Sequence, residues 1–600
     1  MTYLYYALLV GLLGYLIWRR YRSHIDAWLL KLPMPQHRLR VERNISIPMR
    51  DGIRLACDIF RPKEPGRYPC LIARTPYSKT GNEHNYQTFA RLYATQGYVV
   101  IVQDVRGKHM SEGVFDPYIN EGSDGHDTIE WAGTQPWCTG KVGMVGFSYL
   151  GSCAWLAAPH RSRYLKTIVP VFTCLNTYAA WMADAVPFVK DMFYWIYKHR
   201  RQGDTELSHT VLDPALRTLP VNEIDEALGE KVPLFRTFLS ERLPSPFWSA
   251  RSSNHLIHKI DVPALIYGGW YDPFTECAIN EFLDLRNSEP PSKSCLSRFI
   301  IGPYAHNPRQ RFKEIKFARS ARFRYQFREI LDWLDGWLKE GGGPPHAGPA
   351  IRYYVMGKDE WRETESWPPK EVVEESFFLT SQGHANSDKG DGRLLNQPPH
   401  QEGYDSYVYD PEDPVPSIGN RLLYGNGLEG PKDQRVLTHR NDILVYNSEV
   451  LAQDFEITGF IRCILFVATS AVDTDFSVKI ADVQPDGKAL FLHSGFLRMR
   501  YRNGPLDEKL VEPGKVYQVQ VELGSFAHLL KAGHRIQLLI TSSDFPARSR
   551  NLNTGADNEF TSPFMTAQQS LYHGPRYPSR LILPRFNLSE PASPPPVESI

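Results

Sequence analysis

A serine flanked by glycines stands between a strand-like and a helix-like segment, and this turn constrains the fold more than any other feature. The run Gly146-Phe147-Ser148-Tyr149-Leu150-Gly151 follows the apolar residues 142–145 and precedes the small and apolar residues 152–158. So sharp a turn leaves no space for side chains beside it, so glycines are needed there and the Ser148 hydroxyl is held above the sheet edge. The next N–H lies at a helix start, where it can stabilise an oxyanion. The second glycine comes one position later than in the generic Gly-x-Ser-x-Gly motif.

Short apolar segments alternate with helical segments on both sides of this turn. Nearly continuous apolar strands that alternate with helices are typical of a parallel sheet covered by helices on both faces. An Asp51-Gly52 turn joins two alternating segments upstream and indicates an antiparallel hairpin. The hairpin strands are expected at 44–49 and 53–60, the sheet strands at 70–73, 98–103, 142–145 and 167–171, and the helices at 84–96, 125–133 and 152–159.

The rest of the chain divides into an insertion, a continuation of the sheet and a separate β-rich part. The chain has 600 residues, 42% of them hydrophobic, which is more than one core normally organises. Residues 172–260 lack strand alternation and contain an aromatic-rich helical stretch, which predicts a helical cap. We therefore expect an α/β core at 40–171 and 261–340, the cap at 172–260, and a β-sandwich at 350–590. Sandwich strands are predicted at 351–356, 460–468, 475–483, 516–522 and 536–541, and a Gly/Pro-rich linker at 341–349 precedes them.

The N-terminal residues 3–18 carry no charge and are followed by Arg19, Arg20 and Arg22. The run is slightly shorter than the roughly 20 residues that span a bilayer, and a basic flank favours the cytosolic side. The sequence thus predicts that residues 1–30 form a single membrane anchor, with the catalytic body in the cytosol. A buried or amphipathic N-terminal helix and a poorly formed secretory signal are the alternatives.

Charge and cysteine content exclude several classes of partner. The formal net charge is +1, and the basic residues are spread along the chain, so no nucleic-acid partner is expected. The eight cysteines are scattered without CxxC spacing, which predicts neither a disulfide framework nor a zinc site. No metal or other cofactor is expected, and the oligomeric state is left open.

Two further residues stand just after predicted strands. Asp272 follows the strand at 264–267, and His306 follows the strand at 298–301. Serine acyl transfer needs a base to accept the hydroxyl proton and a carboxylate to orient that base. In the α/β-hydrolase arrangement these residues follow in the order Ser, acid, His at the carboxyl ends of strands. The order Ser148, Asp272, His306 therefore predicts a catalytic triad.

The motifs around these residues resemble those of the CocE/NonD family of α/β-hydrolases, whose relatives include X-Pro dipeptidyl peptidases and α-amino-acid ester hydrolases. The similarity runs from about residue 43 to about residue 586, and the later position of the second glycine is a family feature. The similarity to this family is carried by the following motifs: Arg74-Thr-Pro-Tyr77, Gln103-Asp-Val-Arg-Gly107, Ser111-Glu-Gly113, Trp137-Cys-Thr-Gly-Lys-Val-Gly143, Gly269-Trp-Tyr-Asp272, Tyr354-Val-Met-Gly357, Asp473-Thr-Asp-Phe476 and Arg550-Asn-Leu-Asn-Thr-Gly555.

The resemblance implies a hydrolase domain, an inserted helical cap and a C-terminal jelly-roll-like domain, with the active site among all three. It implies that Ser148 is the nucleophile, Asp272 the acid and His306 the base. The N–H of Tyr149 and the phenol of Tyr77 would form the oxyanion hole, and Tyr77 stands after a strand, where this fold supplies its second donor. Trp155, Phe274 and, more approximately, Trp181 match positions that flank an acyl pocket, and all three could equally be core aromatics.

The predicted function is ester hydrolysis of a small molecule through an acyl-enzyme. An acyltransferase would use the same residues with a bound alcohol or amine in place of water. A peptidase or amidase of the X-Pro type would need an acidic site for the free amine, and the sequence identifies none. A binding module without catalysis is the non-enzymatic alternative, but it conflicts with the presence of the serine, the histidine and both glycines.

Overall fold

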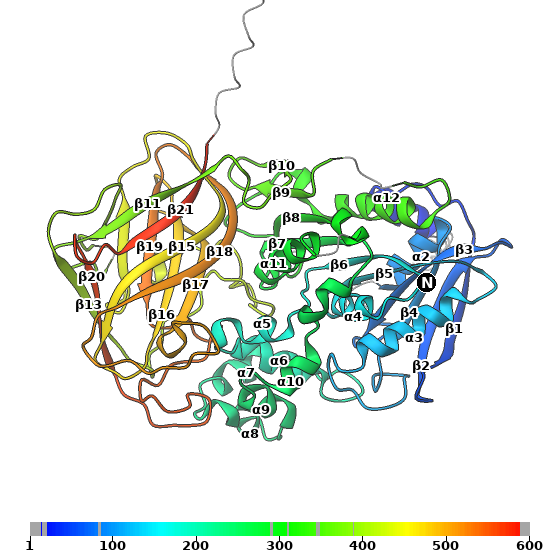
Figure 1. Cartoon of the computed structure of the whole chain (residues 1–600), viewed down its shortest axis with the longest axis horizontal. Coiled ribbons are helices and arrows are strands. Elements are labelled where there is room, and N and C mark those ends of the chain that lie inside the picture. The colour runs from blue at the N-terminus through cyan, green and yellow to red at the C-terminus, as the bar shows by residue number, and fades with distance from the viewer. Residues whose placement is uncertain are drawn as a thin grey trace, which may run out of the picture.

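The computed structural model describes residues 14, 18, 21–81, 86–288, 292–308, 311–343, 348–387 and 389–587. They form an α/β unit, a group of cap helices and a β-rich domain. Figure 1 shows the β-rich domain on one side, the α/β unit on the other, and the cap helices between them at the base. The predicted α/β-hydrolase sheet with a C-terminal β-sandwich is confirmed.

The α/β unit is built on a mixed sheet of ten strands in the order β1-β2-β4-β3-β5-β6-β7-β8-β9-β10. The neighbouring strands from β4 to β9 run parallel, whereas β1, β2 and β10 each pair antiparallel with a neighbour. All carboxyl ends of the parallel strands therefore meet at one edge of the sheet. The strands are β1 (Leu39–Pro48), β2 (Arg54–Pro62), β3 (Tyr68–Thr75), β4 (Val99–Asp104), β5 (Cys138–Phe147), β6 (Leu165–Val171), β7 (Leu265–Tyr271), β8 (Arg298–Ala305), β9 (Ile351–Val355) and β10 (Glu360–Thr364).

Helices pack on this sheet through the apolar face that each of them buries. The helix α4 is an exception, because it is buried on all sides. In α12 the residues Ile330, Leu331, Leu334 and Leu338 recur at helical spacing and are all buried. Every residue of α4 is buried, which is expected for a helix that follows the central strand. The helices of this unit are α2 (Tyr86–Thr95), α3 (Glu121–Gly133), α4 (Tyr149–Ala157), α11 (Thr275–Arg286) and α12 (Gln326–Leu338).

One predicted strand belongs to a different sheet from the one expected. Residues 351–356 were predicted in the β-sandwich, but β9 pairs in parallel with β8 and extends the hydrolase sheet. The units β8, α12 and β9 form a crossover connection, which returns the chain to the same sheet. The described residues of the Gly/Pro-rich stretch, 341–343 and 348–349, thus belong to the connection between α12 and β9, and the interpretation of this stretch as a linker between domains is wrong. Apolar alternation identifies a strand but does not say which sheet it joins.

The cap is inserted between β6 and β7. Its longest helix, α6, is buried along its whole length, so its aromatic side chains are covered on every face. The cap consists of short helices: α5 (Thr177–Trp181), α6 (Val189–His199), α7 (His209–Ala215), α8 (Ile224–Ala227), α9 (Pro233–Ser240) and α10 (Pro246–Arg251).

The C-terminal domain is a β-sandwich. The first half of β18 alternates between buried and exposed residues, whereas β16 and β17 are buried along almost their whole length. Its strand order is β13-β20-β15-β21-β11-β12-β14-β19-β16-β17, and β18 pairs with β15. The strands are β11 (Val372–Thr380), β12 (Arg393–Leu395), β13 (Gly403–Tyr409), β14 (Leu444–Ser448), β15 (Phe455–Thr469), β16 (Asp475–Val483), β17 (Ala489–Arg498), β18 (Tyr517–Leu530), β19 (Arg535–Thr541), β20 (Ala567–His573) and β21 (Arg580–Phe586).

The apolar run 3–18 of the predicted membrane anchor falls almost entirely outside the described residues, which include only Gly14 and Trp18 of this run. Within the described part of the chain, no helix is both long and apolar enough to cross a membrane. Residues 21–30 are helical, and Ala27 in this helix is completely buried. The anchor at residues 1–30 and the cytosolic location of the catalytic body stay predictions.

Candidate active site

Ser148 lies in the turn between β5 and α4 and has a backbone conformation that residues other than glycine rarely adopt. Its φ is 57° and its ψ is −127°, a conformation that costs about 1–3 kcal/mol and is concentrated at active sites. A Cβ atom on Gly146 would stand 2.1 Å from the Leu150 carbonyl carbon, and one on Gly151 would stand 2.5 Å from the Thr173 Cγ2 atom. The second glycine therefore lies where the first turn of α4 packs against the residue that follows β6. This contact leaves no space for a side chain at position 151, three residues after the serine.

Three side chains from distant parts of the chain meet beside this turn. Asp272 follows β7 and His306 follows β8, at the edge of the sheet where Ser148 follows β5. The His306 Nε2 atom is 3.0 Å from the Ser148 Oγ atom, and its Nδ1 atom is 2.7 Å from the Asp272 Oδ1 atom. Because a carboxylate only accepts, Nδ1–H donates to Asp272 and Nε2 is left to accept the Ser148 hydroxyl proton. Asp272 is completely buried, and the arrangement can deprotonate the Ser148 hydroxyl.

The two expected oxyanion donors, Tyr77 and Tyr149, both line the space above Ser148. Tyr77 follows β3, and the indole N–H of Trp195 donates to its phenol oxygen at 3.2 Å. Trp195 belongs to α6 of the cap, so the cap fixes the position of a phenol that the sheet supplies. Tyr149 is the first residue of α4, which places its N–H at the amino end of a helix.

The side chain of Tyr149 anchors the turn through hydrogen bonds to Glu121 and Tyr118. Its hydroxyl donates to the Glu121 carboxylate at 2.6 Å and accepts the Tyr118 N–H at 2.9 Å. Burial raises the pKa of Glu121 to about 7, although the nearby Arg74 guanidinium opposes this change. The ring of Tyr149 is stacked on that of Trp195, with centroids 5.6 Å apart. These contacts hold the residue after the serine in place.

A compact aromatic pocket of about 30 Å³ adjoins Ser148. Phe274 contacts it, with its ring edge-on to that of His306 at a centroid distance of 5.3 Å. Trp181 of α5 lines the same pocket and is 2% exposed. The other large side chains of its wall are Tyr118, Trp195, Leu423 and Tyr424.

Trp155, the third aromatic expected beside the acyl group, is completely buried and does not line this pocket. It stands seven positions after Ser148 on α4, which is about 10 Å along a helix axis. Trp155 thus packs in the core beneath the site.

Sequence reasoning missed Leu423 and Tyr424, which lie in the segment between β13 and β14. Asp191 of α6 accepts the N–H groups of both residues, at 2.9 and 3.1 Å. The cap thereby holds a segment of the C-terminal domain against the pocket. No local pattern marks this contact, because it depends on how the cap meets a loop more than 200 residues away. Trp195 was also missed, since an aromatic-rich helix is interpreted first as helix core.

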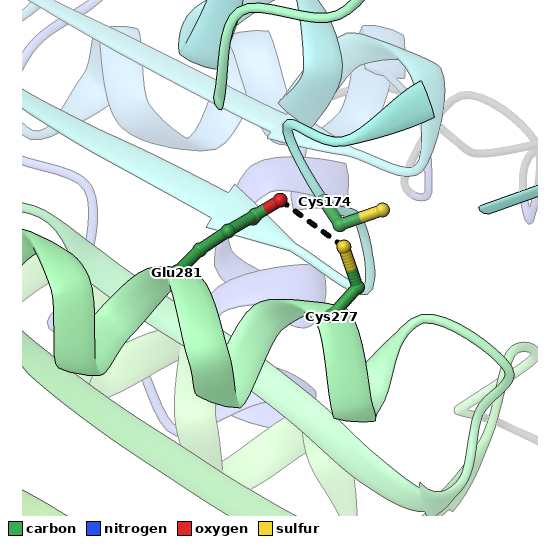
Figure 2. Close-up of side chains that lie close together, drawn as sticks. All are labelled: Cys174, Cys277 and Glu281. Carbon is green, nitrogen blue, oxygen red and sulfur yellow. Dashed lines mark hydrogen bonds between the residues drawn. The ribbon is translucent and has the colours of Figure 1, made fainter. Parts of the chain in front are cut away.

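One group of potential metal ligands occurs among the described residues, at the back of the compact pocket. Donor atoms of Cys174, Cys277 and Glu281 lie within 4.8 Å of one another (Figure 2). The Glu281 Oε1 atom already accepts the N–H groups of Leu175 and Asn176 at 2.7 Å each and the Cys277 thiol at 3.1 Å. Burial contributes to raised pKa values of both thiols and raises that of Glu281 to about 7. A metal would have to displace these protons, so the cluster fits a role in holding the loop after β6.

Comparisons with known proteins agree with this architecture. Residues 51–308 match the X-Pro dipeptidyl-peptidase (S15 family), and residues 346–582 match the X-Pro dipeptidyl-peptidase C-terminal non-catalytic domain. The chain is 34% identical to the cocaine esterase of Rhodococcus sp. (strain MB1 Bresler), an alignment that covers 91% of this chain and 98% of the esterase.

Two solved structures share the fold over nearly the whole chain. An aminopeptidase from a marine sediment archaeon, Thaumarchaeota archaeon, is similar with a TM-score of 0.79 at 25% identity, covering 92% of this chain and 97% of that one. An α-amino acid ester hydrolase is similar with a TM-score of 0.79 at 24% identity and the same coverage.

Proposed function

This chain belongs to the CocE/NonD family of α/β-hydrolases and is a serine esterase, and from that premise we propose that Ser148, His306 and Asp272 perform its acyl transfer. The Ser148 oxygen attacks the ester carbonyl carbon while its proton passes to the His306 Nε2 atom. The bond between the carbonyl carbon and the alcohol oxygen then breaks, and His306 returns the proton to the departing alcohol. Water repeats the sequence and releases the acid. The observation that carries this proposal is the hydrogen-bonded chain of 2.7 and 3.0 Å.

The compact pocket is the proposed site of the acyl group. Its wall is aromatic, and none of the described residues that line it carries a carboxylate. A short aliphatic acyl group such as acetyl suits such a space, whereas a long acyl chain would overfill it. The free amine of an X-Pro dipeptide would need an anionic partner in this position, so ester hydrolysis is favoured over peptidase chemistry.

Substrates with one leaving group and different acyl groups test the assignment. We expect kcat/KM for p-nitrophenyl acetate to exceed that for p-nitrophenyl decanoate by at least about 10-fold, because the pocket admits only a compact group. Ala-Pro-p-nitroanilide should be cleaved no faster than without enzyme. A higher kcat/KM for the anilide than for the esters would instead assign the protein to the peptidases.

The phenol of Tyr77 is proposed to stabilise the oxyanion together with the N–H of Tyr149. Tyr77→Phe removes the hydroxyl and keeps the ring, so kcat on p-nitrophenyl acetate should fall by about 100- to 1,000-fold. The matched control is Tyr404→Phe, at a position in β13 that is 56% exposed, and it should retain wild-type kcat. Wild-type turnover in Tyr77→Phe would remove this phenol from the mechanism.

A further inference from the structure

A second, much larger cavity reaches the catalytic serine from the other side. Its volume is about 1160 Å³, above the range of about 300–1,000 Å³ that is usual for small-molecule pockets. Tyr77, Ser148, His306, Leu423 and Tyr424 line both spaces, so the nucleophile lies where they join. The acyl half and the alcohol half of an ester bound at Ser148 can therefore extend into different spaces, one into the compact pocket and the other into the large cavity.

The large cavity lies on the side of the leaving group. Tyr149, whose N–H is the proposed oxyanion donor, lines the compact pocket and not the large cavity. Pro303, Tyr304 and Asn307, which flank His306 along the chain, line only the large cavity. Because His306 must deliver its proton to the alcohol oxygen, the alcohol leaves on the His306 side.

The inner wall of this cavity is apolar and is built from three separate segments. The helix α2 contributes Phe89 and Tyr93, and the stretch after β8 contributes Phe317, Phe323 and Phe327. The far end is formed by the N-terminal helical residues 21–30, through Leu29 and Leu30. Asp26 in this helix pairs with Arg91 of α2, which attaches the helix to the wall.

Most charged residues of the lining lie in its outer parts. Arg311, Lys316 and Arg322 are exposed, whereas Lys198 of α6 lines the cavity as a buried cation. Asp26, the one acidic residue among the described lining residues, is engaged with Arg91. A cavity whose inner wall is mainly apolar and whose exposed rim is cationic suits a long hydrocarbon chain better than a polar peptide.

We propose that this cavity binds the alcohol half of the substrate, and that the enzyme cleaves esters of a compact acid with a long-chain lipophilic alcohol. This inference rests on the proposed function, because it uses the same serine and the same compact acyl site. The hydrocarbon chain would run from His306 between α2 and the 312–327 stretch toward the N-terminal helix.

Two matched ester series test the proposal with the full-length chain, each substrate below its aggregation concentration. In the first series acetic acid is esterified with methanol, hexanol or dodecanol, and in the second methanol is esterified with hexanoic or dodecanoic acid. We expect kcat/KM to rise at least about 100-fold from methyl to dodecyl acetate, because each added methylene of the alcohol moves from water into the apolar cavity. We expect kcat/KM to fall along the methyl ester series. A flat or declining acetate series overturns the inference. If no ester of either series is hydrolysed, the proposed function itself fails.

Ala318 offers a way to block the cavity without touching the catalytic residues. Ala318 is half-buried in the lining, so Ala318→Trp should lower the dodecyl-to-methyl ratio of kcat/KM at least about 10-fold by filling the space. Ala318→Ser, which adds little volume, and Leu506→Trp, at a position that is 70% exposed in the C-terminal domain, should keep the wild-type ratio. Retained labelling of Ala318→Trp by a fluorophosphonate probe shows that the site has folded. An unchanged ratio in a labelled Ala318→Trp protein contradicts the proposal.

Discussion

Ser148→Ala is expected to lower kcat on p-nitrophenyl acetate by about a million-fold, the loss that follows removal of the nucleophile in a serine hydrolase. The reason is that the substitution removes the Oγ atom that the strained turn holds 3.0 Å from the His306 Nε2 atom. A fluorophosphonate probe, which reacts with an activated serine, should label the wild type and leave the variant unlabelled. Steady-state hydrolysis and probe labelling measure the two effects independently.

The matched control for this substitution is Ser123→Ala. Ser123 lies in α3, where its hydroxyl donates to the Asn120 carbonyl at 3.2 Å, away from the catalytic turn. This variant should keep wild-type turnover and labelling. Probe labelling that persists in Ser148→Ala would show that another residue is the nucleophile, and an unlabelled, inactive wild type would favour a binding protein without catalysis.

Ser148, Asp272 and His306 could be located from the sequence because local patterns carry the necessary information. Each residue follows a short apolar segment, and parallel strands bring their carboxyl ends to a common edge. The glycines at 146 and 151 identify the turn, since a Cβ atom at either position would collide with neighbouring atoms. Sequence position alone thus predicts that these side chains lie near one another.

The pocket could not be predicted in the same way, because its walls come from contacts between distant segments. Tyr424 reaches the site only because Asp191 of the cap binds the loop that carries it. Trp155 and Trp181 both looked like pocket residues, but one is turned into the core by its position on α4 and the other lines the pocket. The strand β9 shows the same limit, since its apolar pattern is compatible with either sheet.

Asp272→Asn is expected to reduce kcat by about 10,000-fold while leaving the fold intact. The carboxylate accepts the His306 Nδ1–H at 2.7 Å and so keeps Nε2 available to accept the serine proton. An asparagine of the same shape can present its own N–H to Nδ1, which would place the histidine proton on Nε2 and leave the Ser148 hydroxyl without a base. Substrate turnover by purified protein measures the loss, and thermal unfolding measures whether the fold is preserved.

The control for this charge change is Asp284→Asn, an exposed position in α11, the helix that begins three residues after Asp272. It should keep wild-type kcat and unfolding temperature. The cost at Asp272 should be mainly in kcat, with KM little changed, because the carboxylate acts through His306 and has no direct contact with the substrate in this mechanism. If Asp272→Asn were to hydrolyse esters at the wild-type rate, His306 would be oriented without its carboxylate, and the assignment of Asp272 as the acid of the triad would be wrong.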